Sequence, residues 1–118
     1  MDFNQNKPIY LQIADSICEK ILSGEYLPDE RILSVRELGI SLGVNPNTIA
    51  RVYEHLQMEV IYNKRGIGYF VAPDAPEKVL KSHREEFLRN ELPAVARKMQ
   101  LLGVPLEVLG EMMKEELR

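Results

Sequence analysis

The feature that most constrains the fold is a pair of short helices predicted on either side of a tight turn. Ser34 and Glu37 have the spacing of a capping box, in which a serine hydroxyl and a glutamate carboxylate satisfy free amides at the start of a helix. Gly43 ends this helix in the usual way. The apolar stripe of the helix consists of Val35, Leu38 and Leu42. A second helix follows at once, because Asn45 can cap it and Pro46 suits its first position, where a missing N–H costs nothing.

The second of these helices has one apolar face and one polar face. The apolar side contains Ile49, Val52, Tyr53 and Leu56. The polar side contains Asn47, Thr48, Arg51 and His55. Short hydrogen-bonding side chains at the start of such a helix, with an arginine one turn further on, are what a recognition helix presents to the major groove of DNA.

A hairpin is predicted directly after this helix. Residues 60–62 and 69–71 favour strands, and two glycines lie in the turn between them. The tip of the hairpin reads Lys64, Arg65, Gly66, Ile67 and Gly68. A generic surface hairpin is the alternative, but the basic tip after a polar-faced helix favours a wing that touches the DNA backbone or minor groove. The fold class is therefore mainly α (α+β), with an N-terminal winged helix-turn-helix.

The remaining segments flank this motif. A helix is predicted from Pro8 or Ile9 to Leu22, where Ser23 and Gly24 stop it, and residues 31–33 favour a brief strand. These segments complete a DNA-binding domain over residues 1–73.

Residues 74–118 form the second predicted domain, a short tail of two or three helices. Pro93 either kinks or splits the first of them, Gly103 ends the next stretch, and Pro105 restarts a helix. A segment of 45 residues rarely buries enough surface to fold alone, so its apolar faces need a partner. A second copy is the simplest one, and we expect a dimerisation domain. The alternative is that the tail packs only on its own N-terminal domain.

Net charge does not support DNA binding. The formal charge is −3, and residues 1–73 hold seven Lys or Arg against nine Asp or Glu. Binding must therefore depend on where the cations lie. Arg36, Arg51, Lys64 and Arg65 all fall in the predicted contact elements. A dimer doubles this set, and its affinity for DNA should fall steeply with salt.

Several classes of function find no support. The sequence contains no apolar run long enough to span a membrane and no signal peptide, so we expect a cytoplasmic protein. Cys18 lies among apolar residues and is expected to be buried and inert. His55 and His83 lack ligand-spaced partners, so no metal is expected. No phosphate-cradling loop and no nucleophile with a base is evident, so we expect neither an enzyme nor a cofactor.

Four segments resemble a known family. Residues 8–13, 34–38, 44–51 and 65–71 read PIYLQI, SVREL, VNPNTIAR and RGIGYFV. With these motifs the sequence resembles the GntR family of bacterial transcription regulators, and within it the short YtrA-like subfamily. The resemblance covers nearly the whole chain. It implies a homodimer on a palindromic operator, usually a repressor, often of an operon that encodes an ABC transporter, and a C-terminal domain too small for an obvious effector pocket.

The resemblance also implies roles for individual residues. Arg36 matches the arginine that such proteins place on a phosphate or base edge. Asn47 and Thr48 match the polar pair that begins the recognition helix, and Gly66 and Gly68 match the wing glycines.

Three positions depart from the family pattern. Leu33 stands where many relatives have proline, and Pro46 and Ala50 stand where much of the wider family has arginine. Base readout inferred from those arginines does not transfer to this chain. Arg51 is the natural substitute, although it lies about 100° around the helix from Ala50.

The candidate DNA-contacting residues share a place in the two helices or the wing; Asn45 is expected to act first as a cap. They are Ser34, Arg36, Asn45, Asn47, Thr48, Arg51, Lys64, Arg65, Gly66 and Gly68.

Two other functions compete with DNA binding. The acidic balance suggests a protein-interaction module that has lost DNA binding. The second competing function is a regulator that senses a small molecule. Its site would lie in the tail and be lined by Met99, Met112 and Met113, although methionines at helical spacing more often pack a core. We do not expect a small-molecule effector.

Overall fold

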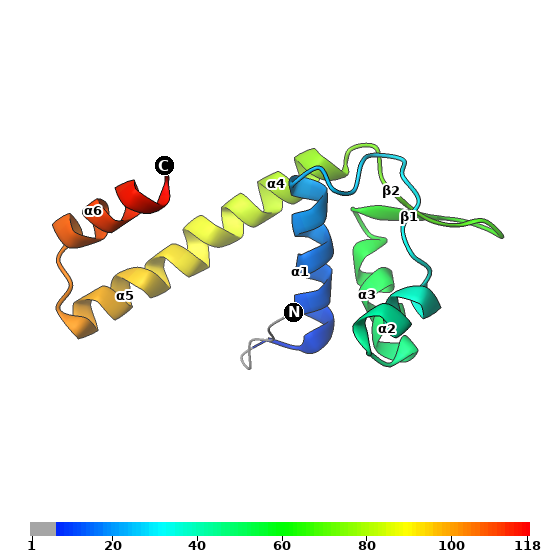
Figure 1. Ribbon diagram of the computed structural model, residues 1–118, viewed down its shortest axis with the longest axis horizontal. Coiled ribbons are helices and arrows are strands. Elements are labelled where there is room, and N and C mark those ends of the chain that lie inside the picture. Colours follow the sequence, from blue (N-terminus) through cyan, green and yellow to red (C-terminus); the bar gives the residue numbers. More distant parts are fainter. Residues whose placement is uncertain (1–6) are drawn as a thin grey trace. The chain divides into compact units, whose positions relative to one another are not determined.

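The chain begins its described part with a long amphipathic helix. The computed structural model describes residues 7–118, and α1 (Ile9–Leu22) has the predicted bounds (Figure 1). Its buried side recurs at helical spacing and consists of Ile13, Ala14, Ile17, Cys18 and Ile21. Beyond its end, Gly24 adopts a left-handed φ of 83°. The predicted first helix is thereby confirmed.

The next two helices are fixed by the caps that the sequence predicts. At the start of α2 (Val35–Leu42), the Ser34 hydroxyl accepts from the Glu37 amide, and the Glu37 carboxylate accepts from the Ser34 amide, both at 3.0 Å. The helix ends at Gly43, whose φ of 66° favours glycine. At the start of α3 (Pro46–Leu56), the Asn45 side-chain oxygen accepts from the Asn47 amide at 2.8 Å.

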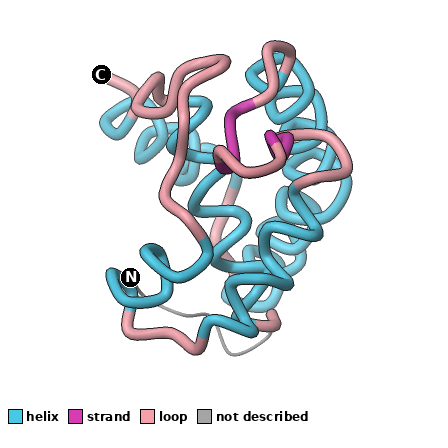
Figure 2. The backbone as a smooth tube through the Cα atoms, turned by 90° about the vertical axis from the view of Figure 1, so that its right-hand side faces the viewer, coloured by secondary structure: helices cyan, strands magenta, loops and turns pink. Residues whose placement is uncertain are grey.

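A two-stranded antiparallel hairpin follows α3. Strands β1 (Ile61–Lys64) and β2 (Gly68–Val71) pair Ile61 with Val71 and Lys64 with Gly68. They are the only named strands in the described part of the chain, which is otherwise helical or loop (Figure 2). Residues 29–32 run along the other edge of β2, where Arg31 forms an isolated bridge with Phe70. The brief strand predicted over residues 31–33 is reduced to this bridge.

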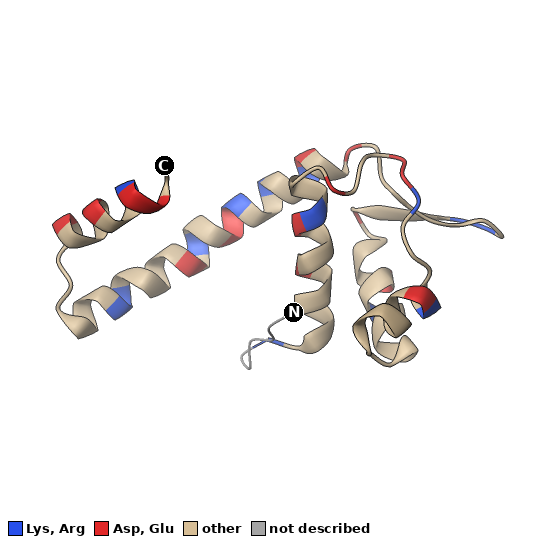
Figure 3. Cartoon of the chain, in the orientation of Figure 1, with Lys and Arg blue, Asp and Glu red and all other residues tan. Residues whose placement is uncertain are grey.

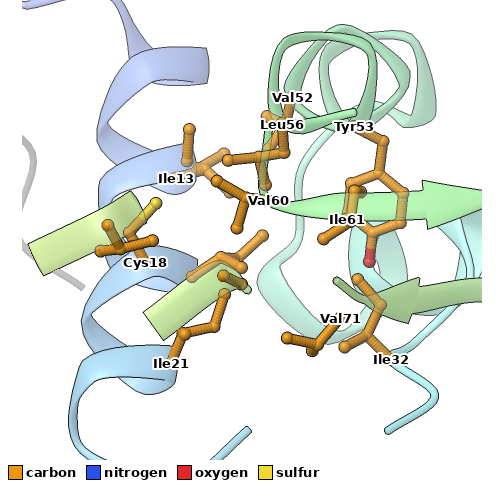
Figure 4. Packing of buried hydrophobic residues seen from close by; sticks show 14 of the residues in the cluster. Ile13, Cys18, Ile21, Ile32, Val52, Tyr53, Leu56, Val60, Ile61 and Val71 are labelled. Carbon is orange, nitrogen blue, oxygen red and sulfur yellow. The ribbon is translucent and has the colours of Figure 1, made fainter. Parts of the chain in front are cut away.

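The core lies where α1, α3 and the hairpin meet, with α3 packed against both α1 and α2 (Figure 4). The labelled side chains come from α1, α3, both strands, the segment before α2 and the turn between α3 and β1, which supplies Val60. Fully buried members include Ile13, Ile49, Val52, Tyr53, Val71 and Val79. Burying each such aliphatic side chain contributes about 1.5–3 kcal/mol. This core packing involves the apolar side of α3.

Burial also explains the state of Cys18. Desolvation, reinforced by the carboxylates of Asp15 and Glu19, raises the pKa of the thiol to about 12. Because the thiolate is the reactive form, a buried thiol with so high a pKa is inert near neutral pH.

The tail is helical, and Pro93 does not split it. Helical residues follow one another from α4 (Ala75–Glu86) through a π-helical turn, η1 (Phe87–Glu91), into α5 (Leu92–Leu102). The Leu92 amide donates to the Phe87 carbonyl, five residues back. In a regular α-helix the Pro93 ring would collide with the carbonyl four residues earlier, and the wider π turn relieves that collision. After Gly103, α6 (Leu106–Glu116) begins beside Pro105.

Contacts divide the chain into two compact units between Lys81 and Ser82. The predicted domain boundary at 73/74 lies earlier, and the difference arises because Ala75 and Val79 of α4 are buried in the core of the first unit. Whether residues 1–73 form a domain by themselves stays a prediction. No helix in the described part of the chain is long and apolar enough to cross a membrane.

The capping box should contribute measurably to stability. We expect Ser34→Ala to lower the free energy of unfolding by about 1 kcal/mol, because it removes the acceptor for the Glu37 amide. Ser41→Ala, at an exposed position within the same helix, is the matched control and should be neutral or slightly stabilising. Urea unfolding followed by circular dichroism measures both, and equal effects of the two variants would contradict the role of the cap.

Candidate nucleic-acid interface

The exposed side of α3 presents a row of polar side chains. Asn47, Arg51 and Glu54 are all exposed, and their spacing of four and three residues places them on one face. The opposite face, including Ile49 and Val52, is fully buried. Thr48, which the sequence groups with Asn47, is half-buried at the flank. The apolar side of α3 is therefore packed in the core, and its polar side is exposed to solvent.

Glu54 is a feature that the sequence analysis missed. It places an exposed carboxylate on the same face as Asn47 and Arg51. A carboxylate there repels phosphate but can accept a hydrogen bond from cytosine. Glu54 lies three residues after Arg51, and this helical spacing could have placed it on the polar face from the sequence alone.

The start of α2 presents Arg36 beside an engaged glutamate. Arg36 is exposed, whereas the Glu37 carboxylate turns back to the Ser34 amide. Hydrogen bonds from the backbone and side chain of Ser34 lower the pKa of Glu37. A lowered pKa means that this cap stabilises the fold above the ordinary pKa of a glutamate and loses its contribution as the pH falls below it. Near neutral pH the α2 amino terminus is thus closed by Ser34 and Glu37, and Arg36 is its outward cation.

The hairpin carries its cations at and beside the turn. Lys64 and Arg65 are exposed, and the Lys64 ammonium lies 5.2 Å from the centre of the Phe70 ring. Phe70 in turn stacks on Tyr62, with ring centres 5.6 Å apart. Gly66 adopts a φ of 79° in the turn, a conformation that side chains disfavour. The wing thus combines a cross-strand aromatic stack with two exposed cations at and beside its turn.

Gly68 has a local structural role that the sequence did not reveal. Its φ is 144°, and a Cβ added there would lie 2.9 Å from the Nε atom of Arg31. The need for glycine at this position therefore comes from the backbone and from the Arg31 side chain packed over it. Arg31 is an exposed cation at the base of the wing, and its position at the start of the predicted brief strand, residues 31–33, was the only sequence signal for it.

Arg51 is held against the first helix. Its guanidinium carbon lies 3.9 Å from the centre of the Tyr10 ring. The His55 ring meets the same tyrosine edge-on, with centres 6.0 Å apart and an interplanar angle of 85°. The sequence places Arg51 and His55 on one face but gives no sign of Tyr10.

Tyr53 joins all three candidate contact elements. This side chain of α3 is only 1% exposed, and its hydroxyl donates to the Leu33 carbonyl just before the cap of α2. Its ring packs edge-on against Tyr69 of β2, with centres 4.8 Å apart. Burial raises the pKa of Tyr53, so the hydroxyl stays protonated as a donor. The candidate residues on α2, α3 and the wing therefore belong to one fixed arrangement.

The described part of the chain contains no candidate metal site. Among residues 7–118, no group of three or more His, Cys, Asp or Glu side chains is placed to hold a metal ion.

The sequence matches a known family of regulators. The family described as "Bacterial regulatory proteins, gntR family" matches residues 9–71, more than half of the chain. The chain belongs to the GntR family. This confirms the resemblance seen in the sequence and places the chain among transcriptional regulators rather than enzymes.

Relatives of known name extend the match beyond the winged domain. This GntR-family chain is 31% identical to the HTH-type transcriptional repressor YtrA of Bacillus subtilis, over 98% of this chain and 88% of YtrA. It is 34% identical to a GntR family transcriptional regulator from Listeria monocytogenes, whose structure gives a TM-score of 0.77 over 96% of this chain and 98% of that one. The predicted fold class is confirmed over almost the full length.

One solved relative is bound to DNA. The crystal structure of AraR(DBD) in complex with operator ORR3 gives a TM-score of 0.54 and 33% identity, over 61% of this chain and 86% of that one. The fold of this GntR-family protein is thus similar to that of a domain crystallised on an operator.

Substitution of Gly68 should expose its local role. We expect Gly68→Ala to lower the free energy of unfolding by about 1–3 kcal/mol, because alanine disfavours this φ and its Cβ meets Arg31. Gly110→Ala, inside α6 with no neighbour in the space of its Cβ, is the control and should stabilise the protein by about 0.5–1 kcal/mol.

Adding Arg31→Ala separates the two causes. In the Gly68→Ala protein, Arg31→Ala should restore only the part of the unfolding free energy that is lost to the collision between the alanine Cβ and Arg31. Thermal unfolding of Gly68→Ala, the double variant and Gly110→Ala measures these effects. A Gly68→Ala protein as stable as wild type would show that neither cause operates.

Proposed function

We propose that this protein is a sequence-specific transcriptional repressor that binds an operator as a cytoplasmic homodimer. The observation that supports this function best is the exposed polar face of α3, in a winged domain whose relatives are transcriptional regulators. The wing and α2, which carry exposed cations, flank this helix in sequence, and Tyr53 of α3 contacts Leu33 just before α2 and Tyr69 of the wing.

The ten candidate residues divide by chemistry. Asn47, Thr48 and Arg51 would read base edges, since asparagine suits adenine and arginine suits guanine in the major groove. Ser34, Arg36 and Asn45 would position the helices on phosphates. Lys64, Arg65, Gly66 and Gly68 would follow the backbone or the minor groove. Asn45 and Ser34 already act as caps, so phosphate contact would be a second role for both.

Local placement of charge offsets the acidic balance of the chain. Lysines and arginines lie at the start of α2 and along the hairpin towards its tip (Figure 3). Four candidate cations in each protomer, Arg36, Arg51, Lys64 and Arg65, give eight in a pair. If six to eight of them neutralise phosphates, the logarithm of affinity should fall with the logarithm of salt at a slope of about −5 to −7.

The second unit supports a homodimer. Neither α5 nor α6 has a buried residue, and Leu101 and Leu106 are 84% and 71% exposed. A hollow of about 320 Å³ lies between these helices, with walls formed by Leu92, Val95, Ala96, Met99, Gln100, Val104, Leu106 and Leu109. Of the three methionines that the sequence suggested for an effector site, only Met99 lines it. A second copy of the chain would cover these residues and bury them.

The target is proposed from resemblance. YtrA is named a repressor, and the short subfamily that this chain resembles often controls an ABC transporter operon. We therefore propose an operator of two half-sites near such an operon, spaced about one helical turn, ~34 Å, apart for a two-fold dimer on one face of the duplex.

Selection of duplex DNA from a random pool tests the function. We expect a two-fold symmetric sequence whose binding weakens steeply with salt. Arg51→Ala should reduce binding of the selected duplex by about 1–3 kcal/mol, whereas Lys64→Ala should weaken selected and random duplexes alike and reduce the salt slope by about one per protomer.

Lys81→Ala provides the control for these measurements, because Lys81 is an exposed lysine outside the candidate elements. Its removal should change neither affinity nor slope. Failure to select any sequence would contradict the proposal. Equal losses of affinity for the selected and random duplexes in Arg51→Ala would show that Arg51 does not read bases.

Sedimentation tests the dimer. The wild-type chain should have twice the mass of its 13.6 kDa monomer. Leu106→Glu should shift it to monomer, since a charge at an apolar interface remains unpaired, while the neighbouring exposed change Glu107→Gln should leave the dimer intact. A wild-type monomer, or a Leu106→Glu dimer of unchanged strength, would contradict an interface at this surface.

A further inference from the structure

The strongest unassigned feature of the winged unit is the cluster formed by Tyr10, Arg51 and His55. The Arg51 guanidinium carbon lies over the tyrosine ring, 3.9 Å from its centre. His55, one helical turn beyond Arg51, meets the same ring edge-on at 6.0 Å. Two residues of α3 therefore contact the ring of one residue of α1.

This contact leaves Arg51 able to donate. A guanidinium that stacks on an aromatic face uses its π surface, while its five N–H groups point outward in its own plane. Those groups are the ones that bind guanine or a phosphate in pairs. Stacking and DNA recognition thus use different parts of the same side chain.

The two helices are themselves fixed. Tyr10 is half-buried in the first turn of α1, and Ile13 three residues later is 1% exposed in the core. On α3, Val52 is fully buried next to Arg51. The ring therefore occupies a set position relative to the backbone of Arg51. A long arginine that is already ordered loses less side-chain entropy when it binds.

We propose that Tyr10 is a positioning residue for DNA recognition: its ring orders the Arg51 guanidinium for base readout, and His55 restrains the ring. The inference rests on the proposed function and deepens it, because it assigns a part in specificity to the first helix. Tyr10 acts through Arg51 and lies outside the set of residues that the recognition helix and wing supply.

A double-mutant cycle on the full chain tests the proposal. The readout is operator preference, the ratio of affinities for the duplex that wild type selects and for a random duplex. Tyr10→Leu should reduce this preference by about 2- to 30-fold, the range of a cation–π contact. Tyr10→Phe keeps the ring and should stay within about 2-fold of wild type. In an Arg51→Ala background, Tyr10→Leu should change the preference no further.

Tyr26→Leu is the matched control. Tyr26 is also half-buried and also lies under a cation, with the Lys20 ammonium 5.3 Å from its ring centre, but Lys20 is at the other end of α1. It should lose stability in the same range as Tyr10→Leu and keep operator preference. Urea unfolding of each variant checks that the protein is folded under binding conditions, and Tyr10→Met, which also removes the ring but keeps apolar bulk, replaces Tyr10→Leu if that variant does not fold.

The possible outcomes distinguish the role of Tyr10 from the proposed DNA-binding function. If wild type selects no DNA, the proposed function and the inference both fall. If wild type selects DNA and Arg51→Ala loses preference while Tyr10→Leu keeps it, only the inference falls. A Tyr10→Leu loss that is equal on both duplexes, or that persists without Arg51, shows a purely structural tyrosine and also overturns the inference.

Discussion

The arrangement of the winged unit depends on one buried tyrosine. Tyr53 lies on the apolar side of α3, donates its hydroxyl to the Leu33 carbonyl, and packs its ring against Tyr69 of the wing. The start of α2, the body of α3 and the hairpin are thereby tied through a single side chain. A protein that reads a rigid duplex needs such fixed spacing, because contacts on separate elements add to affinity only when they meet the DNA together.

In an acidic chain, carboxylates near the candidate cations keep their charge but can be held in place by hydrogen bonds. Glu37 is bound by the amide of Ser34, and Asp29 accepts a hydrogen bond from the Tyr62 hydroxyl at 3.0 Å. Arg36 and Arg65 remain outward. The exposed carboxylate of Glu54 lies on the polar face of α3, where it would weaken non-specific phosphate binding. A weak background of this kind favours discrimination between sequences.

Local signals made much of the fold predictable, while contacts between distant residues did not. The Ser34 capping box, the Asn45 cap and the end of α2 at Gly43 each depend on neighbours within a few residues, and each was predicted. The stack of Arg51 on Tyr10 and the packing of Arg31 over Gly68 join residues far apart in the chain. No periodicity or cap encodes such pairs, so the supporting contacts of the candidate site came only from the structure.

The π turn before Pro93 has a consequence for how the tail can vary. The turn inserts extra backbone into an otherwise regular helix, and each residue of an α-helix advances its direction by about 100°. Loss of a single residue between Phe87 and Glu91 would therefore rotate every side chain of α5 relative to residues 82–86, which precede the turn in the same unit. This stretch should accept many exchanges of one amino acid for another and yet reject a change of length, so its residue count is more constrained than its composition.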